Sequence, residues 1–292
     1  VVVALPAAVP LTRAVELVYP TLQRYVPLLL GVVAAVLVAI EPTWRRRAAA
    51  VVTLAVAGGM GWLTLDLEPT GVLAAGSVLA PLFAGLFGAP VLVEALAGEG
   101  VPPQTDPTVT LDRRTVLGSA GAGAGAGALV GYLPGVSAAV GTVLVLPAVP
   151  GRSGARGFVV ASSGANTANT VFALFALVAL GTPRTGVMVA MERAGVTDPL
   201  LPLVGAACLA AAAGFVLVVS VGDVYLRTVG RLDYTRVSLA TGGLLACVAV
   251  LFAGTLGLAV FALAALVGLL PPLLGVRRVH LMAVLAPAIV AP

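Results

Sequence analysis

A tract of small polar side chains interrupts an otherwise apolar stretch between residues 161 and 170. Its hydroxyl and amide residues are Ser162, Ser163, Asn166, Thr167, Asn169 and Thr170. Asn166 and Asn169 are three residues apart, so we expect them to share a helical face. Neutral oxygens of this kind suit Na⁺ or the hydroxyl and carboxylate groups of a substrate. Because unpartnered amides are unfavourable in lipid, we favour a cation- or substrate-binding site. Hydrogen bonding between helices, or a loop, is the alternative.

A helix break precedes this tract. The sequence Leu-Pro-Gly-Val-Ser, residues 133–137, places proline and glycine inside an apolar run. A new helix is expected to begin near Ser137, whose hydroxyl can cap the exposed N–H groups. The N-terminus of a half-helix attracts anions. Pro134, Gly135 and Ser137 are therefore candidate contacts for a substrate carboxylate, and a kink without a ligand is the equally supported alternative.

A second break follows the tract, in the sequence Gly-Thr-Pro-Arg-Thr-Gly over residues 181–186. Arginine binds carboxylates through two parallel hydrogen bonds. Thr182 and Arg184 are therefore further candidate substrate contacts, with Arg184 as an auxiliary anion clamp. For Arg152 and Arg156 the preferred interpretation is loop charge that sets membrane topology.

Glycine alternates with alanine from Gly121 to Gly127. The pairs Gly121/Gly125 and Gly123/Gly127 have the spacing that allows two membrane helices to approach closely. Close packing is the favoured interpretation, and a thin, bendable helix beside a substrate path is the alternative.

The remaining residues carry little chemistry. His280, the single histidine, is expected to be a surface or interface side chain rather than a proton relay, and Glu94 to face a cavity or mark the end of a span. Cys208 and Cys247 lie in apolar runs without metal-site spacing. The sequence has no nucleophile–base set, paired acids, metal cluster or phosphate loop. We therefore expect no enzyme activity, no cofactor and no metal beyond Na⁺, with Na⁺ or H⁺ as the coupling ion.

The composition requires these residues to be positioned by membrane helices. Of 292 residues, 60% are hydrophobic and 10% are charged, against roughly 25% charged in a soluble domain. These values exclude a soluble enzyme, a disordered chain and a nucleic-acid-binding domain. We predict an all-α, polytopic membrane bundle with broken or re-entrant helices. The uncharged runs give its spans: 48–65, 69–93 and 199–222 as single spans, and 237–276 as two spans that turn near Gly254–Gly257.

Arginines between the runs predict the topology. All 16 basic residues are arginine, and three of them, Arg45, Arg46 and Arg47, follow Trp44 directly. Placing this loop and the arginines at 113–114, 227–236 and 277–278 in the cytoplasm agrees with the positive-inside rule for most spans.

The three motifs around 133–137, 163–169 and 181–186, in this order and spacing, resemble the second half of the large permease subunit of tripartite tricarboxylate transporters. The resemblance is strongest over 115–195 and is closest to the archaeal branch. It implies a secondary transporter that moves small carboxylates with a cation gradient, assisted by a small membrane subunit and an extracytoplasmic binding protein. It also implies two inverted halves, each with its own Pro-Gly break.

This chain shows one strong break, and it starts at Val1 inside an apolar stretch. We therefore expect the N-terminal repeat to be absent, either because the chain is a fragment or because two copies pair as a homodimer. The expected organisation is one integral membrane domain, with flanking helices in 1–114, the family-like core in 115–195 and C-terminal helices in 196–292. The favoured function is a cation-coupled permease for a small organic anion in the inner membrane. A non-transporting scaffold or truncated remnant is the alternative.

Overall fold

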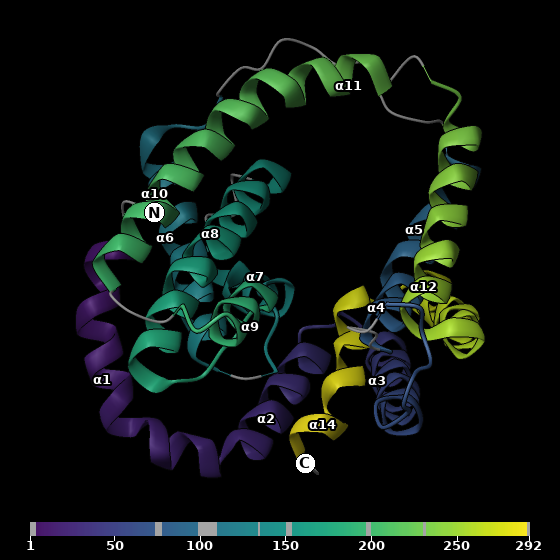
Figure 1. The fold of residues 1–292 in the computed structure, drawn as a ribbon, viewed down its shortest axis with the longest axis horizontal. Coiled ribbons are helices and arrows are strands. Elements are labelled where there is room, and N and C mark those ends of the chain that lie inside the picture. Colours follow the sequence, from purple (N-terminus) through teal and green to yellow (C-terminus); the bar gives the residue numbers. More distant parts are fainter. Residues whose placement is uncertain are drawn as a thin grey trace. The chain divides into compact units, whose positions relative to one another are not determined.

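The computed structural model describes residues 4–73, 78–98, 110–133, 135–149, 154–196, 200–229 and 232–290. Within these ranges the chain forms helices joined by turns and contains no strand (Figure 1). Among the described residues, five helices are long and apolar enough to cross a membrane, or six if the bent pair α1–α2 counts as one span. This confirms the predicted all-α polytopic class. The inverted-repeat relationship stays a prediction.

The helices gather into two compact units. Unit 1 combines Val1–Val33 with Pro107–Ser220, and unit 2 combines Ala34–Asp106 with Val221–Pro292. The predicted division into flanking, core and C-terminal parts, and the absence of an N-terminal repeat, stay predictions.

Unit 1 is built around α6 and α8. Its helices are α1 (Ala4–Arg24), the first part of α2 (Val26–Ala39), α6 (Arg113–Tyr132), α7 (Ala138–Val145), η2 (Leu146–Ala148), α8 (Gly154–Leu180), α9 (Gly186–Arg193) and α10 (Leu200–Leu217). Helices α1 and α2 meet at an 88° bend. The core places Ala8 of α1 against Tyr132 of α6 and Phe172 of α8. No side chain of α10 is buried, as expected for a helix whose apolar surface faces lipid.

Unit 2 packs α3 and α12 against shorter helices. Its members are α3 (Trp44–Thr64), α4 (Leu79–Phe83), η1 (Ala84–Gly88), α5 (Ala89–Ala97), α11 (Asp223–Val229), α12 (Tyr234–Gly268), α13 (Leu270–Leu274), η5 (Arg278–Leu285) and α14 (Pro287–Val290). Its core contains Leu82, Leu86, Val260, Leu281 and Val284. The prediction of a single span over 69–93 was wrong at its start, because residues 67–71 have no regular structure and the helix begins at Leu79.

The long apolar run 237–276 is broken where glycine permits it. Helix α12 has non-helical backbone at Ala253 and at Gly254, whose φ is 62°. Leu73 donates its backbone N–H to the carbonyl of Leu251 at 3.2 Å, so the preceding loop satisfies a carbonyl at this break. The predicted break near Gly254 is confirmed, and the division of this run into two spans stays a prediction.

Side-chain caps fix several helix starts. The hydroxyl of Thr43 accepts from the backbone N–H of Arg46 at 3.3 Å, and that of Thr185 from Met188 at 3.4 Å. Asp112 accepts from the Thr115 backbone at 3.1 Å and also from its hydroxyl. These hydrogen bonds, led by the one from the hydroxyl, lower the pKa of Asp112 because they favour its ionised form.

Candidate functional site

The helix break before the polar tract lies where the sequence predicts it. Helix α6 ends at Tyr132, Leu133 is extended, and Gly135 has a φ of 78°. Helix α7 then begins after Ser137, whose hydroxyl accepts from the Val140 N–H at 3.3 Å. Pro134 lies outside the described residues. The break and its cap are confirmed, and the assignment of Gly135 and Ser137 to substrate stays a prediction.

Helix α7 packs back along α6 and is too short to cross a membrane. A Cβ added at Gly141 would lie 3.1 Å from the carbonyl oxygen of Ala126, so the two helices touch through their backbones. Together α7 and η2 extend from Ala138 to Ala148, a length of roughly 16 Å at 1.5 Å per residue. A span needs about 30 Å. Helices α6 and α7 therefore form a helical hairpin whose second arm stops part-way.

Glycines let α6 and α8 pack in parallel at close range. A Cβ on Gly123 would overlap the carbonyl oxygen of Ala161, and one on Gly127 would lie 2.6 Å from the Cβ of Ala168. One on Gly131 would lie 2.6 Å from the Cβ of Phe172. Gly121 and Gly125 have nothing within 4 Å of that position. Close packing thus applies to the Gly123/Gly127 pair and not, within the described residues, to the other pair.

The polar tract belongs to one unbroken helix and divides between two faces. Ser163, Asn166, Thr167 and Thr170 are exposed and follow an i, i+3, i+4, i+7 spacing, so they form one stripe. Thr167 and Thr170 donate to carbonyls of their own helix at 2.9 and 3.2 Å, and Asn166 donates to the carbonyl of Ser162 at 3.0 Å. We call these four residues the exposed stripe.

Ser162 and Asn169 are seven residues apart and occupy the second face. Both are half-buried. Ser162 donates to the carbonyl of Val159 at 3.1 Å. The amide oxygen of Asn169 is buried and has no hydrogen-bond partner among the described residues. Asn166 and Asn169 therefore differ in environment although they are only three residues apart.

The turn after α8 holds the other predicted residues. Helix α8 ends at Leu180, and Gly181 has a φ of 60°. The guanidinium of Arg184 donates to the Tyr19 hydroxyl and lies 5.5 Å from the centroid of that ring. Its Nε is buried without a hydrogen-bond partner among the described residues, and so is the hydroxyl oxygen of Thr182. A buried donor without a partner is unfavourable, so the turn is chemically incomplete.

Helix α1 connects this turn to the break. Its Thr12 hydroxyl lies 2.5 Å from the Tyr132 hydroxyl, directly before the break, and its Tyr19 contacts Arg184. Thr12 and Tyr19 are seven residues apart and share a face. The structure thus brings the 133–137 break and the 182–184 turn to one face of α1. It does not bring the exposed stripe there, because the α6 contacts on Ala161, Gly164 and Ala168 occupy the opposite side of α8.

Sequence reasoning missed Thr12, Tyr19 and Tyr132. Their signal was weak: Ala4, Ala8, Thr12 and Tyr19 form a stripe of small and polar side chains along a helix that contains Arg13 and Glu16. Nothing in that pattern indicates which distant residue each hydroxyl meets.

A comparison with known protein families shows the family of this chain. A model described as the tripartite tricarboxylate transporter TctA family matches residues 1–283. The chain belongs to this family. No curated protein and no solved structure matches it. This TctA-family chain is therefore a multi-pass membrane transporter permease and not an enzyme. Its placement in the archaeal branch and its match to the second half of family members stay predictions.

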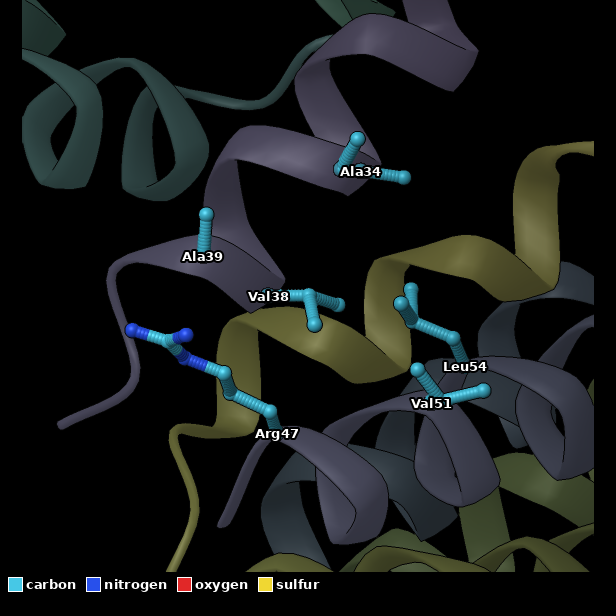
Figure 2. A pocket seen from close by; sticks show the side chains of 7 residues that line it. Ala34, Val38, Ala39, Arg47, Val51 and Leu54 are labelled. Atoms are coloured by element: carbon cyan, nitrogen blue, oxygen red, sulfur yellow. The ribbon is translucent and has the colours of Figure 1, made fainter. Parts of the chain in front are cut away.

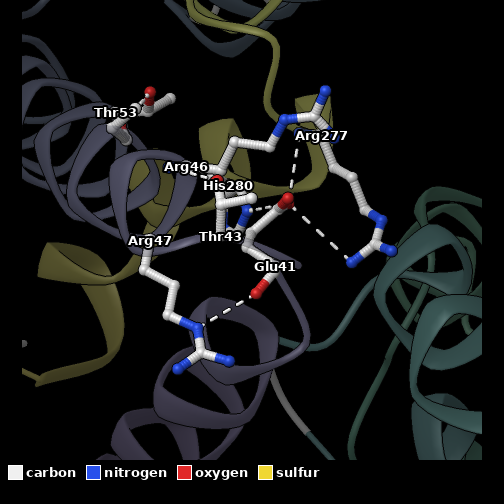
Figure 3. A network of polar contacts seen from close by, with 8 residues as sticks. Glu41, Thr43, Arg46, Arg47, Thr53, Arg277 and His280 are labelled. Carbon is white, nitrogen blue, oxygen red and sulfur yellow. Dashed lines mark hydrogen bonds and ion pairs between the residues drawn. The ribbon is translucent and has the colours of Figure 1, made fainter.

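The TctA-family chain has a second polar cluster, in unit 2 (Figure 3). Glu41 and His280 are 2% and 0% exposed. One carboxylate oxygen of Glu41 lies 3.1 Å from His280 Nε2 and 3.8 Å from the Arg277 guanidinium, and it accepts from the Arg277 backbone N–H at 3.4 Å. The predicted surface position of His280 was wrong, because η5 packs against α3 and the residue is buried, and the alternative, an interface position, stays a prediction.

The protonation of His280 follows from this geometry. Residue 280 lies beyond Leu274, where the last candidate span ends. Burial lowers the pKa of His280, as does Arg277, while the hydrogen bond and charge of Glu41 act in the opposite direction. An ionised carboxylate can only accept, so Nε2 carries the proton and the unpartnered Nδ1 is an acceptor. A neutral imidazole thus serves as the donor to Glu41.

Metal ligation by charged side chains is not indicated here. The described residues contain no group of three or more His, Cys, Asp or Glu side chains placed to hold a metal ion. Na⁺ bound by amide and hydroxyl oxygens would not depend on such a group. Glu94 pairs with Arg278 near the end of α5, which agrees with its expected place at a span end.

Proposed function

We propose that this chain is a cation-coupled secondary transporter that moves tri- or dicarboxylates by alternating access. The carrying observation is the incomplete turn at Thr182 and Arg184, where a buried guanidinium nitrogen and a buried hydroxyl oxygen lack partners among the described residues. Charged groups inside a membrane protein mark ligand pathways. A carboxylate supplies the acceptors that Arg184 needs.

Tyr19 orients the guanidinium for this role. Its hydroxyl accepts from one terminal nitrogen of Arg184, and Arg184 Cζ lies over its ring, 5.5 Å from the centroid. These contacts fix the orientation of the guanidinium and leave Nε available to donate to a carboxylate. A fixed fork binds a carboxylate with less loss of side-chain entropy than a free one.

A second carboxylate group of the substrate would approach the break. Helix α7 presents its first N–H groups there, and Ser137 satisfies only that of Val140. Helix N-termini attract negative charge. Gly135 and Gly181, both at positive φ, give the two segments backbone freedom for a change of access. Pro134, which lies outside the described residues, stays a candidate contact for the substrate.

The coupling cation, Na⁺ or H⁺, would depend on the polar tract. The buried, unpartnered amide oxygen of Asn169 is an available hard ligand, and Ser162 lies on the same face. The exposed stripe of Ser163, Asn166, Thr167 and Thr170 would line the aqueous side of the pathway or contact a partner.

Partners follow from the word tripartite in the family description. We propose a small membrane subunit and an extracytoplasmic binding protein, with a homodimer as a further arrangement. The lipid bilayer would be the inner membrane. No nucleic acid is expected.

One observation favours a second function, a non-transporting scaffold or remnant. Three side chains of the exposed stripe already donate to carbonyls of their own helix. Such local hydrogen bonds satisfy polar groups without any ligand. A scaffold would leave the stripe in this state permanently.

Uptake measurements separate the two functions. In cells that express the full-length transporter with its partner subunits, Arg184→Gln is expected to reduce uptake of labelled citrate by roughly 10- to 100-fold, as for one lost charge-assisted hydrogen bond of ~1.5–3 kcal/mol. Arg184→Lys is expected to recover only part of the uptake, because lysine cannot bind a carboxylate through two parallel hydrogen bonds. Arg193→Gln, at an exposed position of α9, is the control. Wild-type KM and rate in Arg184→Gln would contradict the assignment.

The cation assignment has its own matched pair. Asn169→Ala is expected to raise the Na⁺ or H⁺ concentration needed for half-maximal uptake, whereas Asn166→Ala, on the exposed stripe, is expected to change it less. Equal effects of the two variants would remove Asn169 from the cation site. No uptake of citrate or of dicarboxylates by the wild-type protein would favour the scaffold.

A further inference from the structure

An apolar groove lies between the second part of α2 and the first half of α3, within unit 2. Its volume is about 440 Å³, within the range of about 300–1,000 Å³ that ligand sites occupy. Figure 2 shows Ala34, Val38, Val51 and Leu54 along the groove and the guanidinium of Arg47 extending toward Ala39 at one end. Among the described residues that line it, Arg47 is the charged one.

The charged end of the groove is prepared for an anion. Arg47 donates from Nε to the backbone carbonyl of Glu41 at 3.0 Å, which leaves its two terminal nitrogens without a partner among the described residues. Arg45 and Arg46 precede it and are also exposed. The nearest carboxylate in sequence, that of Glu41, is buried and is paired with His280 and Arg277. The exposed charge at this end is therefore positive.

The same end has the marks of a membrane interface. Trp44 is 80% exposed and begins α3, a candidate span that continues to Thr64. Exposed tryptophan beside arginine at the start of a span is typical of the headgroup region. From Arg47 to Leu54 the groove follows α3 for roughly 10 Å toward the membrane interior.

From this arrangement we propose that the groove binds one anionic phospholipid. The phosphate lies at Arg47, with Arg45 and Arg46 near its headgroup, and the upper part of one acyl chain lies along Val38, Val51 and Leu54. A phospholipid satisfies both ends of the groove, whereas a free phosphate would leave the apolar part empty. Basic pockets between membrane helices bind anionic headgroups in this way. The site is independent of the transport function proposed above.

The test is lipid retention by the purified full-length protein, measured by native mass spectrometry. The protein is delipidated and then mixed with phosphatidylglycerol or phosphatidylcholine of equal chain length. We expect one phosphatidylglycerol to be retained in preference to phosphatidylcholine. Each arginine contributes about fivefold to anionic-lipid affinity. The double variant Arg45→Gln/Arg46→Gln keeps the Arg47 hydrogen bond, and its affinity for phosphatidylglycerol is therefore expected to fall more than tenfold.

Two further variants test the two ends separately. Arg47→Gln is expected to lower the affinity for phosphatidylglycerol about fivefold, and Ala35→Phe, which fills the groove, is expected to abolish retention of either lipid. Arg114→Gln, exposed at the start of α6, is the control and should retain the lipid. Equal retention of both lipids by the wild-type protein would overturn the proposal. Release of phosphatidylglycerol by excess inorganic phosphate would also overturn it, because the site would then be a free-anion site.

Discussion

Each unit of the chain buries charged side chains among apolar helices, but the partners of these side chains differ between the two units. In unit 2 the Glu41 carboxylate is held by His280, by the Arg277 backbone and by the Arg277 guanidinium. In unit 1 Arg184 donates to Tyr19, while its buried Nε and the buried hydroxyl of Thr182 have no hydrogen-bond partner among the described residues. Both clusters also hold buried atoms without a hydrogen-bond partner among the described residues: Arg277 Nη1 and His280 Nδ1 in unit 2, and Arg184 Nε and Thr182 Oγ1 in unit 1. The difference lies in the charge, because the Arg277 guanidinium lies 3.8 Å from a carboxylate, whereas Arg184 meets the hydroxyl and ring of Tyr19 and, within the described residues, no carboxylate. Pairing with an opposite charge, more than burial, distinguishes the structural arginine from the one that we propose for substrate.

The largest expected effect is on stability, in unit 2. Glu41→Ala removes the acceptor that His280 and Arg277 share, and losing a hydrogen bond to a charged group typically costs about 1.5–3 kcal/mol. A thermal unfolding scan of the purified protein in detergent should show a lower Tm. Glu94→Ala removes a half-exposed partner of Arg278 and should cost about 1 kcal/mol or less. If the two variants lower Tm equally, the Glu41 cluster is not the stronger structural element.

The next effect tests how closely α6 and α8 pack in unit 1. Gly123→Ala places a methyl group on the carbonyl of Ala161, and such overpacking typically costs about 1–3 kcal/mol. Gly125→Ala meets no atom within 4 Å and should stabilise the helix by about 0.5–1 kcal/mol. Opposite shifts in Tm would confirm close packing of α6 on α8. A tolerated alanine at 123 would indicate that the two helices separate easily.

Thr182→Val tests whether the Thr182 hydroxyl serves stability or substrate binding, because the two roles predict opposite changes. Because the Thr182 hydroxyl oxygen is buried without a partner among the described residues, its replacement by a methyl group of similar shape should leave stability unchanged or raise it by about 1 kcal/mol. Citrate uptake should fall, since the hydroxyl would contact the substrate. Lower Tm together with normal uptake would instead assign the hydroxyl to a structural role.

Local features of this fold were predictable from the sequence, because each depends on neighbours in the chain. The break at 133–137, the cap at Ser137 and the break at Gly254 all follow from residue types whose backbone preferences act within a few positions. The start of the span after Pro69 was predicted wrongly, because an uncharged run does not show where helical backbone begins.

Contacts between distant segments were not predictable. Tyr19 meets Arg184 across 165 residues, and Glu41 meets His280 across 239. A single sequence shows which side chains can form hydrogen bonds, but helix packing decides which of them meet. The same holds within α8. The periodicity places Asn166 and Asn169 within one turn, and only the position of α6 leaves the first exposed and buries the oxygen of the second.

The smallest expected effect concerns the pH dependence of unit 2. Burial lowers the pKa of His280 in the folded protein. In the unfolded chain the imidazole has its ordinary pKa of about 6.5, so the unfolded chain binds a proton at a higher pH than the folded one. The unfolded state therefore holds more protons just below that pH, and stability should fall as the pH drops through about 6.5 toward the lower pKa of the folded state. Above this range His280 is neutral in both states and contributes no slope. Tm should thus decrease between about pH 7.5 and 5.5, and His280→Gln, which keeps an N–H donor for Glu41 but cannot titrate, should show a smaller decrease. An equal decrease in both proteins would attribute the acid sensitivity to groups other than His280.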